Sequence, residues 1–431
     1  MDIEIKLLNK IKSIISYLNE KGFIHLLTVN LFSQFLSFVT LMLVAKFLSP
    51  AEYGDLKVLQ TYVNITVVIA LFGFNSAAIK LCSENIAEDE RAAIFQNILK
   101  RAGVSTLITL LGGILLSSFG LITSSSFLSK WLIIYLAIVP IDVLTTLLTT
   151  YLQSKKQFKR IASAQAIFRI QTAPIILLGT WRWGFQGFIV ASIISHGIGL
   201  WPFLRYVGGG IFKKFNIAVP NQLMRYASFS FLAQILNQFT INGDILILDH
   251  FSRNRESIGY YSLALLFILA ATLVSQTVQS ITTPYFSQNA NNELWFRNHF
   301  RKNLSRMVAF STAVAIAINL VGRIIIPLFY GPTYRPTFEY LQILLIGAIF
   351  QGIYALINSA ITGLGKMKYT FIIAALSTPV ELGLTYFSLQ RYGFIGVAWS
   401  QVITSLFILI LNLIFVHIAM KQNFAKPQNV S

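Results

Sequence analysis

The sequence predicts an all-α polytopic membrane protein with about 12 transmembrane helices in two six-helix lobes. Three observations predict this fold class. The 431 residues are 55% apolar and only 12% charged, whereas soluble domains contain about 25% charged residues. Apolar runs of about 20 residues, long enough to cross ~30 Å of hydrocarbon, recur along the chain. Short motifs of the first half also return in the second half.

Twelve hydrophobic segments are long enough to span a bilayer. They cover residues 25–48, 58–79, 94–119, 128–151, 161–180, 186–206, 223–249, 259–283, 304–329, 338–361, 370–389 and 394–419. The connecting segments are short, so no separate soluble domain is expected. Because a lipid-facing backbone must satisfy its own hydrogen bonds, segments of this length are expected to be helices.

Residues 1–21 lack the continuous apolar core of a signal peptide. Their isoleucines and leucines fall on one helical face, with Lys6, Lys10 and Lys12 among them. This pattern predicts an amphipathic helix on the cytoplasmic membrane surface, where lysines meet anionic lipid. An N-lobe is expected over residues 22–210 and a C-lobe over residues 211–431.

The basic excess indicates topology. The chain has 34 Lys and Arg against 16 Asp and Glu, a formal net charge of +18. Placing both termini in the cytoplasm puts most of these basic residues in cytoplasmic loops, as the positive-inside rule requires. Arg169 and Arg323 are the two basic residues assigned to neither side, and both lie within predicted helices. No basic soluble module exists to bind nucleic acid.

Metal and redox sites are not expected. Cys82 is the single cysteine, so no internal disulfide can form. The five histidines are scattered without metal-ligand spacing. No cofactor is expected, apart from a proton or sodium ion as a coupling ion.

An internal repeat relates the two halves. Residues 184–188 (GFQGF), which open the sixth segment, resemble residues 393–397 (GFIGV), which open the twelfth. Residues 153–158 and 363–368 correspond in the loops before them. Six segments per half is an even number, so the repeat is parallel, with a substrate path expected between the halves. A duplicated structural protein would show the same pattern.

Several motifs carry a family resemblance. They are the outer loop at residues 46–54 (KFLSPAEYG), residues 258–261 (IGYY), Pro284, and residues 363–366 (GLGK) before residues 392–396 (YGFIG). With these motifs the chain resembles the polysaccharide-transporter, or O-antigen flippase, branch of the multidrug/oligosaccharidyl-lipid/polysaccharide (MOP) exporter superfamily. The motifs are structural and do not identify a glycan.

The resemblance implies a multi-pass protein of the bacterial inner membrane with a V-shaped architecture like that of multidrug (MATE) exporters. Its substrate would be an undecaprenyl-pyrophosphate-linked oligosaccharide, moved from the cytoplasmic to the periplasmic leaflet by alternating access. Such a protein is a transporter and not an enzyme. Its expected partners are this lipid-linked glycan, membrane lipids and other polysaccharide-assembly membrane proteins.

Arg169 is the leading candidate for a head-group contact. It lies near the midpoint of the fifth segment, where a charge is costly and therefore faces a cavity or a partner. An arginine there can bind two phosphate oxygens at once. The alternative is a structural ion pair with Asp142 in the fourth segment.

The other intramembrane charges also have two interpretations each. Glu381 could couple transport to a proton, or it could order a nearby Arg or Lys. Asp244 and Asp249 lie toward the outer end of the seventh segment, where access to water is the ordinary explanation. Arg323 is expected to extend toward the interface.

Amides on equivalent segments of the two halves form the last candidate set. They are Asn30 and Gln34 in the first segment and Gln234, Asn237, Gln238 and Asn242 in the seventh. Amides suit sugar hydroxyls because each offers a donor and an acceptor. They serve equally well in hydrogen bonds between helices.

Two other functions are alternatives to the flippase. A multidrug cation antiporter of the same superfamily would need an acidic cavity, but Asp142, Asp244 and Glu381 do not clearly dominate beside Arg169. A glycan ligase or polymerase would need paired acidic or histidine groups on a long outer loop. The sequence offers no such loop.

Overall fold

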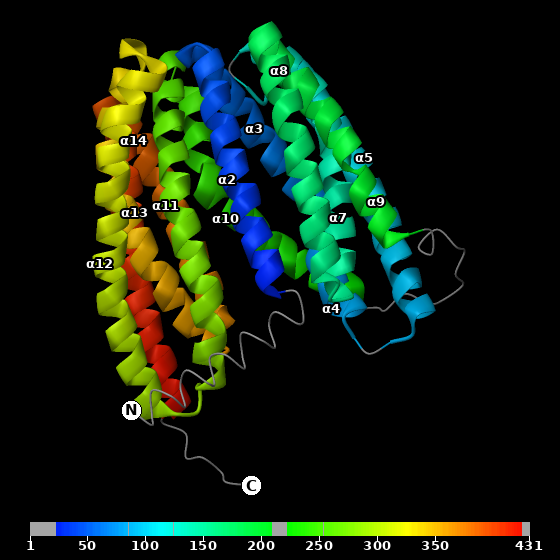
Figure 1. Cartoon of the computed structure of the whole chain (residues 1–431), viewed down its shortest axis with the longest axis vertical. Coiled ribbons are helices and arrows are strands. Elements are labelled where there is room, and N and C mark those ends of the chain that lie inside the picture. Colours follow the sequence, from blue (N-terminus) through cyan, green and yellow to red (C-terminus); the bar gives the residue numbers. More distant parts are fainter. Residues whose placement is uncertain (1–22, 85, 124, 209–221, 253, 425–431) are drawn as a thin grey trace. The chain divides into compact units, whose positions relative to one another are not determined.

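The computed structural model describes residues 23–84, 86–123, 125–208, 222–252 and 254–424. Helices joined by short turns make up these residues, and no strand occurs among them (Figure 1). The all-helical prediction is therefore confirmed. The amphipathic helix predicted for residues 1–21 lies outside the described residues.

The helices follow one another with few residues between them. In order they are α2 (Phe23–Phe47), α3 (Pro50–Leu71), α4 (Phe74–Cys82), α5 (Glu88–Ser118), α6 (Ser126–Tyr135), η1 (Leu136–Ile138), α7 (Val139–Ser154), α8 (Phe158–Gly199), α9 (Trp201–Val207), α10 (Gln222–Phe251), α11 (Arg255–Gln288), α12 (Glu293–Ile325), η3 (Ile326–Tyr330), η4 (Pro332–Tyr334), α13 (Arg335–Gly363) and α14 (Met367–Phe424).

Helices α8 and α14 are each interrupted by a glycine with positive φ. Gly184 has φ 59° and ψ −139°, and Gly393 has φ 62° and ψ −150°, a region that L side chains rarely adopt. A Cβ on Gly187 would overlap the carbonyl oxygen of Gly179. Eight residues of straight helix would separate these two glycines by about 12 Å. The chain therefore turns back at Gly184.

The same contact recurs in α14, where a Cβ on Gly396 would approach the Ser388 carbonyl oxygen to 2.5 Å. Each of these two long helices is thus a hairpin of two arms. The repeated motif that opens the predicted sixth and twelfth segments supplies both the glycine of the turn and the glycine of the close contact.

By length and composition, eight of the described helices can cross a membrane, or nine if α3 and α4, bent by 45°, form one span. This number counts α8 and α14 once each, although each contains two arms. It also leaves out α2, whose stretch Phe32–Phe47 is a shorter apolar helix. Each of the twelve predicted segments is helical over most of its length, although the second runs across the break between α3 and α4 at Phe72 and Gly73.

The chain divides into two compact units. The first contains the described residues of Met1–Phe47 and Tyr62–Ile235, and the second contains those of Leu48–Thr61 and Leu236–Ser431. The boundaries lie inside α3 and α10, whereas the predicted lobe boundary at residues 210 and 211 lies between α9 and α10. Helix α3 therefore begins in the second unit and ends in the first, and α10 does the reverse.

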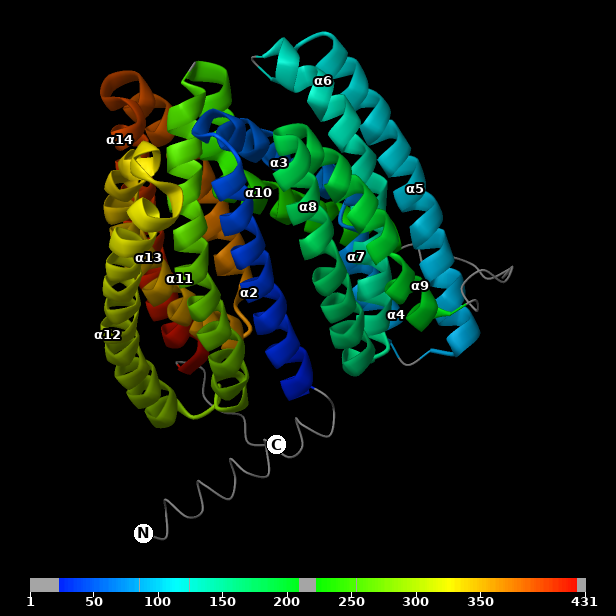
Figure 2. The same ribbon diagram turned by 45° about the horizontal axis from the view of Figure 1, so that its top comes forward.

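The first unit is built from α2, α4 to α9 and parts of α3 and α10. Helix α2 packs along α8, and α4 packs against α5 and α7. Figure 2 shows α6 returning beside α5. Phe95 of α5 stacks on Tyr151 of α7 with ring centroids 4.3 Å apart. This contact fixes α5 and α7 beside each other.

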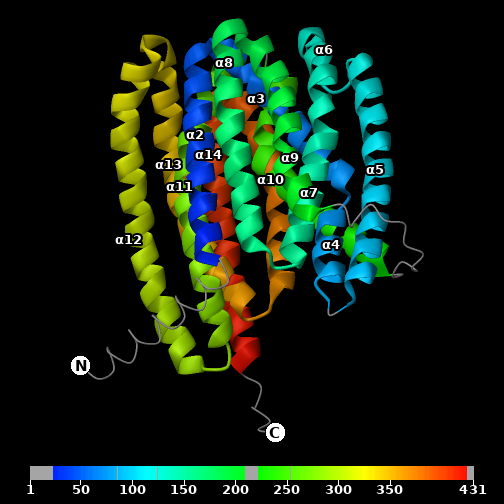
Figure 3. The same ribbon diagram turned by 45° about the vertical axis from the view of Figure 1, so that its right-hand side comes forward.

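The second unit is centred on α13, which packs against α11, α12 and α14 (Figure 3). Its core contains the fully buried Phe286 of α11, Phe296 of α12 and Ile357 of α13. Met307 of α12 and Val416 of α14 extend the same core. Close van der Waals packing of these apolar side chains holds the four helices together.

The predicted outer loop at residues 46–54 is, from Pro50 onward, the first turn of α3. Both the backbone N–H and the hydroxyl of Ser49 donate to Glu52 Oε2, each at 2.9 Å. Pro50 occupies the first helical position, where its missing N–H costs nothing. Ser49 and Glu52 therefore form a capping box that starts the helix earlier than predicted.

This first turn of α3 crosses α11 at close range within the second unit. A Cβ on Gly259 would overlap the carbonyl oxygen of Pro50, and one on Gly54 would overlap that of Arg255. Tyr334 donates a hydrogen bond of 3.2 Å to the Leu48 carbonyl nearby. Each helix thus supplies a glycine to this crossing.

We predict that Gly259→Ala lowers the free energy of unfolding by about 1–3 kcal/mol, because its methyl group forces two backbones apart. Unfolding of purified protein in mixed micelles would measure the change. Gly103→Ala is the matched control, because no described atom lies within 4 Å of the added Cβ. Equal stability of the two variants would contradict the close crossing.

Candidate functional site

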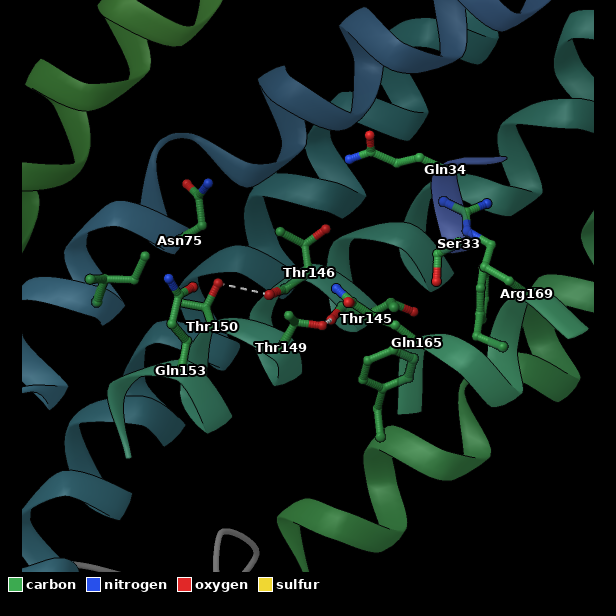
Figure 4. Close-up of a pocket in the computed structure, with 13 residues that line it drawn as sticks. Ser33, Gln34, Asn75, Thr145, Thr146, Thr149, Thr150, Gln153, Gln165 and Arg169 are labelled. Atoms are coloured by element: carbon green, nitrogen blue, oxygen red, sulfur yellow. Dashed lines mark hydrogen bonds between the residues drawn. The ribbon is translucent and has the colours of Figure 1, made fainter. Parts of the chain in front are cut away.

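A polar pocket of about 480 Å³ lies in the first unit. Four described helices contribute most of its wall, and Figure 4 shows how the side chains converge. The lining residues are Ser33 and Gln34 of α2, Asn75 and Ile79 of α4, Thr145, Thr146, Thr149, Thr150 and Gln153 of α7, Gln165, Phe168 and Arg169 of α8, and Phe203 of α9. Most of these side chains can form hydrogen bonds.

Helix α7 contributes a stripe of four threonines and Gln153. Their spacing follows the helical period, so all five share one face. Thr145, Thr149 and Thr150 each donate to the carbonyl oxygen four residues earlier, at 2.8 Å. A hydroxyl that donates in this way keeps lone pairs that accept hydrogen bonds. The stripe therefore suits a ligand rich in hydroxyl groups.

Arg169 is the one charged residue among the lining residues. Its side chain is exposed, and its guanidinium lies 5.3 Å from the centre of the Phe168 ring. Figure 4 places it on the opposite side of the pocket from Asn75 and Gln153. Within the described part of the chain it has no ion pair.

The alternative partner of Arg169, Asp142, is engaged elsewhere. Asp142 Oδ1 lies 2.7 Å from His196 Nδ1, on the second arm of α8. Asp142 still attracts Arg169 electrostatically, but from beyond ion-pair distance. Phe168 packs edge-on against His196 with centroids 5.1 Å apart. The geometry thus favours the cavity interpretation of Arg169 over the structural pair.

Two buried oxygen atoms of lining residues lack a hydrogen bond among the described residues. They are Ser33 Oγ and Gln165 Oε1. Buried polar atoms of this kind normally bond to water or a ligand. The pocket therefore has unused hydrogen-bonding capacity beside Arg169.

The predicted amides have different surroundings. Gln34 lines the pocket, and the side chain of Asn30 lies outside the described residues. Gln234 exchanges two amide hydrogen bonds with Asn75, of 3.2 and 3.3 Å. Gln234 therefore links α10 to α4. Because Asn75 also lines the pocket, this pair of hydrogen bonds lies at the pocket wall.

Three further amides belong to the second unit and are not among the lining residues of this pocket. Asn237 is exposed, Gln238 is half-buried and Asn242 is buried. Asn242 donates to the Gln238 carbonyl at 3.5 Å. The symmetry expected between the amides of the two halves is therefore not seen in this pocket.

The second unit holds a separate cluster of buried acids. Asp244 accepts hydrogen bonds from the Tyr261 hydroxyl at 2.7 Å and from the Ile245 N–H at 2.8 Å. Glu381 Oε1 accepts one from Gln401 at 2.9 Å, and its Oε2 has no hydrogen-bond partner in the described part. The two acids interact electrostatically with each other. Lys57 also interacts electrostatically with Asp244.

Burial of these acids corrects one expectation. Asp244 is 2% exposed and Asp249 is fully buried, so access to water does not explain them. Asp249 instead forms an ion pair of 2.6 Å with Arg255, because a buried charge needs a partner. Arg323 is exposed on α12, where no ion pair is seen among the described residues.

Sequence reasoning missed the threonine stripe, Gln165, Lys57, Tyr261 and Gln401. The stripe had a visible signal, because residues 145–153 (TTLLTTYLQ) alternate polar and apolar pairs at helical spacing. Lys57 had none, since it was placed in the outer loop. No group of three or more potential metal-ligating side chains occurs among the described residues.

Comparison with known families identifies one match. The family model for polysaccharide biosynthesis proteins matches residues 20–290. A Shigella flexneri protein assigned as an O-antigen transporter is 24% identical over 61% of this chain and 64% of its own length. The amylovoran biosynthesis protein AmsL of Erwinia amylovora is 22% identical over 43% of this chain and 48% of its own. The chain thus spans less than two thirds of either relative.

Two solved structures share the fold over nearly the whole chain. The lipid II flippase MurJ, in an inward closed conformation, superposes with a TM-score of 0.77 at 18% identity and covers 93% of this chain and 90% of its own. An inward-facing MATE multidrug transporter of the MOP superfamily also gives 0.77, at 13% identity, over 91% of this chain and 96% of its own. These similarities show the fold.

We predict that His196 and Asp142 stabilise the fold as a pair. Substituting either with alanine should cost about 1–3 kcal/mol, because its half-buried partner loses a hydrogen bond. The double variant should cost less than the two losses combined. A double-mutant cycle in unfolding free energy measures this coupling, and strictly additive losses would refute it.

Proposed function

The chain belongs to the polysaccharide biosynthesis protein family of the MOP superfamily, and on this premise we propose that it is a flippase for a lipid-linked oligosaccharide. Its substrate would be an undecaprenyl-pyrophosphate-linked repeat unit of O-antigen or a similar surface polysaccharide. Movement would run from the cytoplasmic to the periplasmic leaflet. The specific glycan is left open.

The proposed mechanism is alternating access by two six-helix lobes. The protein crosses the membrane several times, and we propose twelve crossings in the inner membrane with both termini in the cytoplasm. Because α8 and α14 are hairpins of two arms, each would cross the membrane twice. The two lobes would form the V-shaped arrangement of the superfamily.

The proposal rests mainly on the polar pocket, in which Arg169 is the charged lining residue. A pyrophosphate cannot enter hydrocarbon unless a cation and hydrogen-bond donors replace its water. A guanidinium offers paired N–H groups that match two phosphate oxygens. The guanidinium is exposed and carries no ion pair among the described residues, so it is available to an anion.

The sugar would bind along the threonine stripe of α7. Hydroxyl groups of a glycan donate to the free lone pairs of Thr145 and Thr149, while Gln34 and Gln153 offer both donors and acceptors. Ser33 Oγ and Gln165 Oε1, which lack partners in the described part, would gain hydrogen bonds. The pocket thereby combines a cationic end with a hydroxyl-binding wall.

Glu381 and Asp244 would couple transport to a proton or a sodium ion. Two buried carboxylates that repel each other bind a cation favourably, because it removes like-charge repulsion. Glu381 Oε2 lacks a hydrogen bond in the described part, so a proton or a cation could bind there. Tyr261 and Gln401 would hold the two carboxylates in position.

A multidrug cation antiporter is the less favoured function. The single lining charge of the pocket is positive, which repels a lipophilic cation. Overexpression that raised drug resistance without affecting surface glycan would favour the antiporter.

We predict that Arg169→Gln lowers the affinity for the lipid-linked substrate by about 10- to 100-fold, since hydrogen bonds to a charged group contribute about 1.5–3 kcal/mol. Surface-glycan assembly in cells deleted for their own flippase would report the loss. Arg169→Lys should give an intermediate result, because it keeps the charge but not the paired donors.

Arg323→Gln is the matched control, because it removes an exposed arginine from α12 of the second unit. It should support full glycan assembly. If Arg169→Gln also supports full assembly while the protein is inserted at normal levels, the role given to Arg169 is wrong.

We predict that Glu381→Gln abolishes the response of transport to an imposed ion gradient, because a neutral amide cannot exchange the coupling ion. Translocation in proteoliposomes, with a proton or a sodium gradient imposed separately, measures this response and identifies the ion. Glu339→Gln, an exposed position on α13, is the control. Gradient stimulation that survives in Glu381→Gln would exclude the coupling role.

A further inference from the structure

Helices α5 and α12 lie at the periphery of their units. Only 17% of the most apolar stretch of each helix is buried, the lowest share among the candidate spans. At about 1.5 Å per residue, the 33 residues of α12 and the 31 residues of α5 extend for about 50 and 46 Å. Both helices therefore exceed a hydrocarbon layer of ~30 Å.

The beginning of α12 has two distinct faces. Phe296 and Met307 point into the core of the second unit. Arg301, Lys302 and Arg306 are exposed on the other side of the helix. Lys302 and Arg306 are four residues apart, so their side chains are neighbours.

An exposed apolar surface begins directly after these basic residues. Val308 and Phe310 are 42% and 43% exposed, and Ile316 and Leu320 are 56% and 57% exposed. In a membrane this surface contacts acyl chains. Arg301, Lys302 and Arg306 are therefore placed at the depth of the lipid phosphates.

Helix α5 repeats this arrangement in the first unit. Lys100 and Arg101 are exposed, and the exposed Val104, Leu107 and Ile108 follow them. On the inner face, Ile98 and Ala102 are buried. Two helices at equivalent places in the repeat thus share one pattern of basic residues followed by apolar residues.

These basic residues differ from others near helix ends. Arg91 and Lys155 both pair with Glu88, at 2.6 and 2.8 Å, and Arg297 pairs with Glu293 at 2.7 Å. Among the described residues, no carboxylate pairs with Arg301, Lys302 or Arg306, nor with Lys100 or Arg101. A membrane-facing cation without a carboxylate is complementary to a lipid phosphate.

We propose that the basic residues at the start of α12 and on α5 form two binding sites for the head group of an anionic phospholipid, such as phosphatidylglycerol. Arg301, Lys302 and Arg306 contact the phosphate at one site, and Lys100 and Arg101 contact it at the other. The acyl chains lie along the exposed apolar surface of the same helix. This proposal is independent of the transported substrate.

Native mass spectrometry of the purified full-length protein, titrated with phosphatidylglycerol, tests the proposal. The unmodified protein should retain two phosphatidylglycerol molecules more tightly than phosphatidylcholine. Arg301→Gln/Lys302→Gln and Lys100→Gln/Arg101→Gln should each weaken one of the two binding events by at least about tenfold. Combining both pairs should weaken both events.

Lys156→Gln/Lys159→Gln is the charge-matched control, because Lys156 is exposed at the turn before α8, Lys159 is exposed in the first turn of α8, and the next seven residues include no exposed apolar side chain. It should retain both lipids. Equal losses in this control and in the test variants, or equal retention of the two lipids by the unmodified protein, would overturn the proposal.

A salt titration needs no variant and guards against misfolding of the substituted proteins. Raising the salt concentration from about 0.1 to 1 M shortens the screening length from ~10 to ~3 Å. It should release phosphatidylglycerol from the unmodified protein, and undiminished retention would contradict a charge-based site.

Discussion

Hydrocarbon forms no hydrogen bonds, and this constraint underlies the rest of the structure. It requires the described chain to be helical between its turns. It also explains why Asp249 is buried together with Arg255. Two side chains that lack a protein partner among the described residues, Arg169 and Gln165, line the polar pocket, where a polar ligand or water can take the place of that partner.

The sequence was sufficient to predict the fold class because hydrophobic length and charge placement act locally. It also singled out Arg169 as a candidate, because a charge within an apolar segment is conspicuous, and Arg169 lines the polar pocket. It failed where the answer depends on which helices become neighbours. Asp142 was the alternative partner considered for Arg169, but it pairs with His196, 54 residues further along the chain. Lys57 near Asp244 could not be anticipated for the same reason.

Helix boundaries were predicted well at one pair of glycines and poorly elsewhere. The motif at Gly184 and Gly393 was predicted to open the sixth and twelfth segments, and the chain turns back at both glycines. Conversely, residues 46–54 look like a loop because they contain Pro50 and Gly54. The proline starts a helix, and the glycine allows α11 to approach.

The division of α3 and α10 between the two compact units has a consequence for assembly. The start of α3, from the first half of the sequence, belongs to the second unit, and the start of α10, from the second half, belongs to the first unit. This exchange resembles a domain-swapped dimer joined into one chain. The two halves depend on each other at this crossing, because Pro50 of α3, from the first half, packs against Gly259 of α11, from the second half. The first half must therefore await synthesis of α10 and α11 before its own α3 is fully packed.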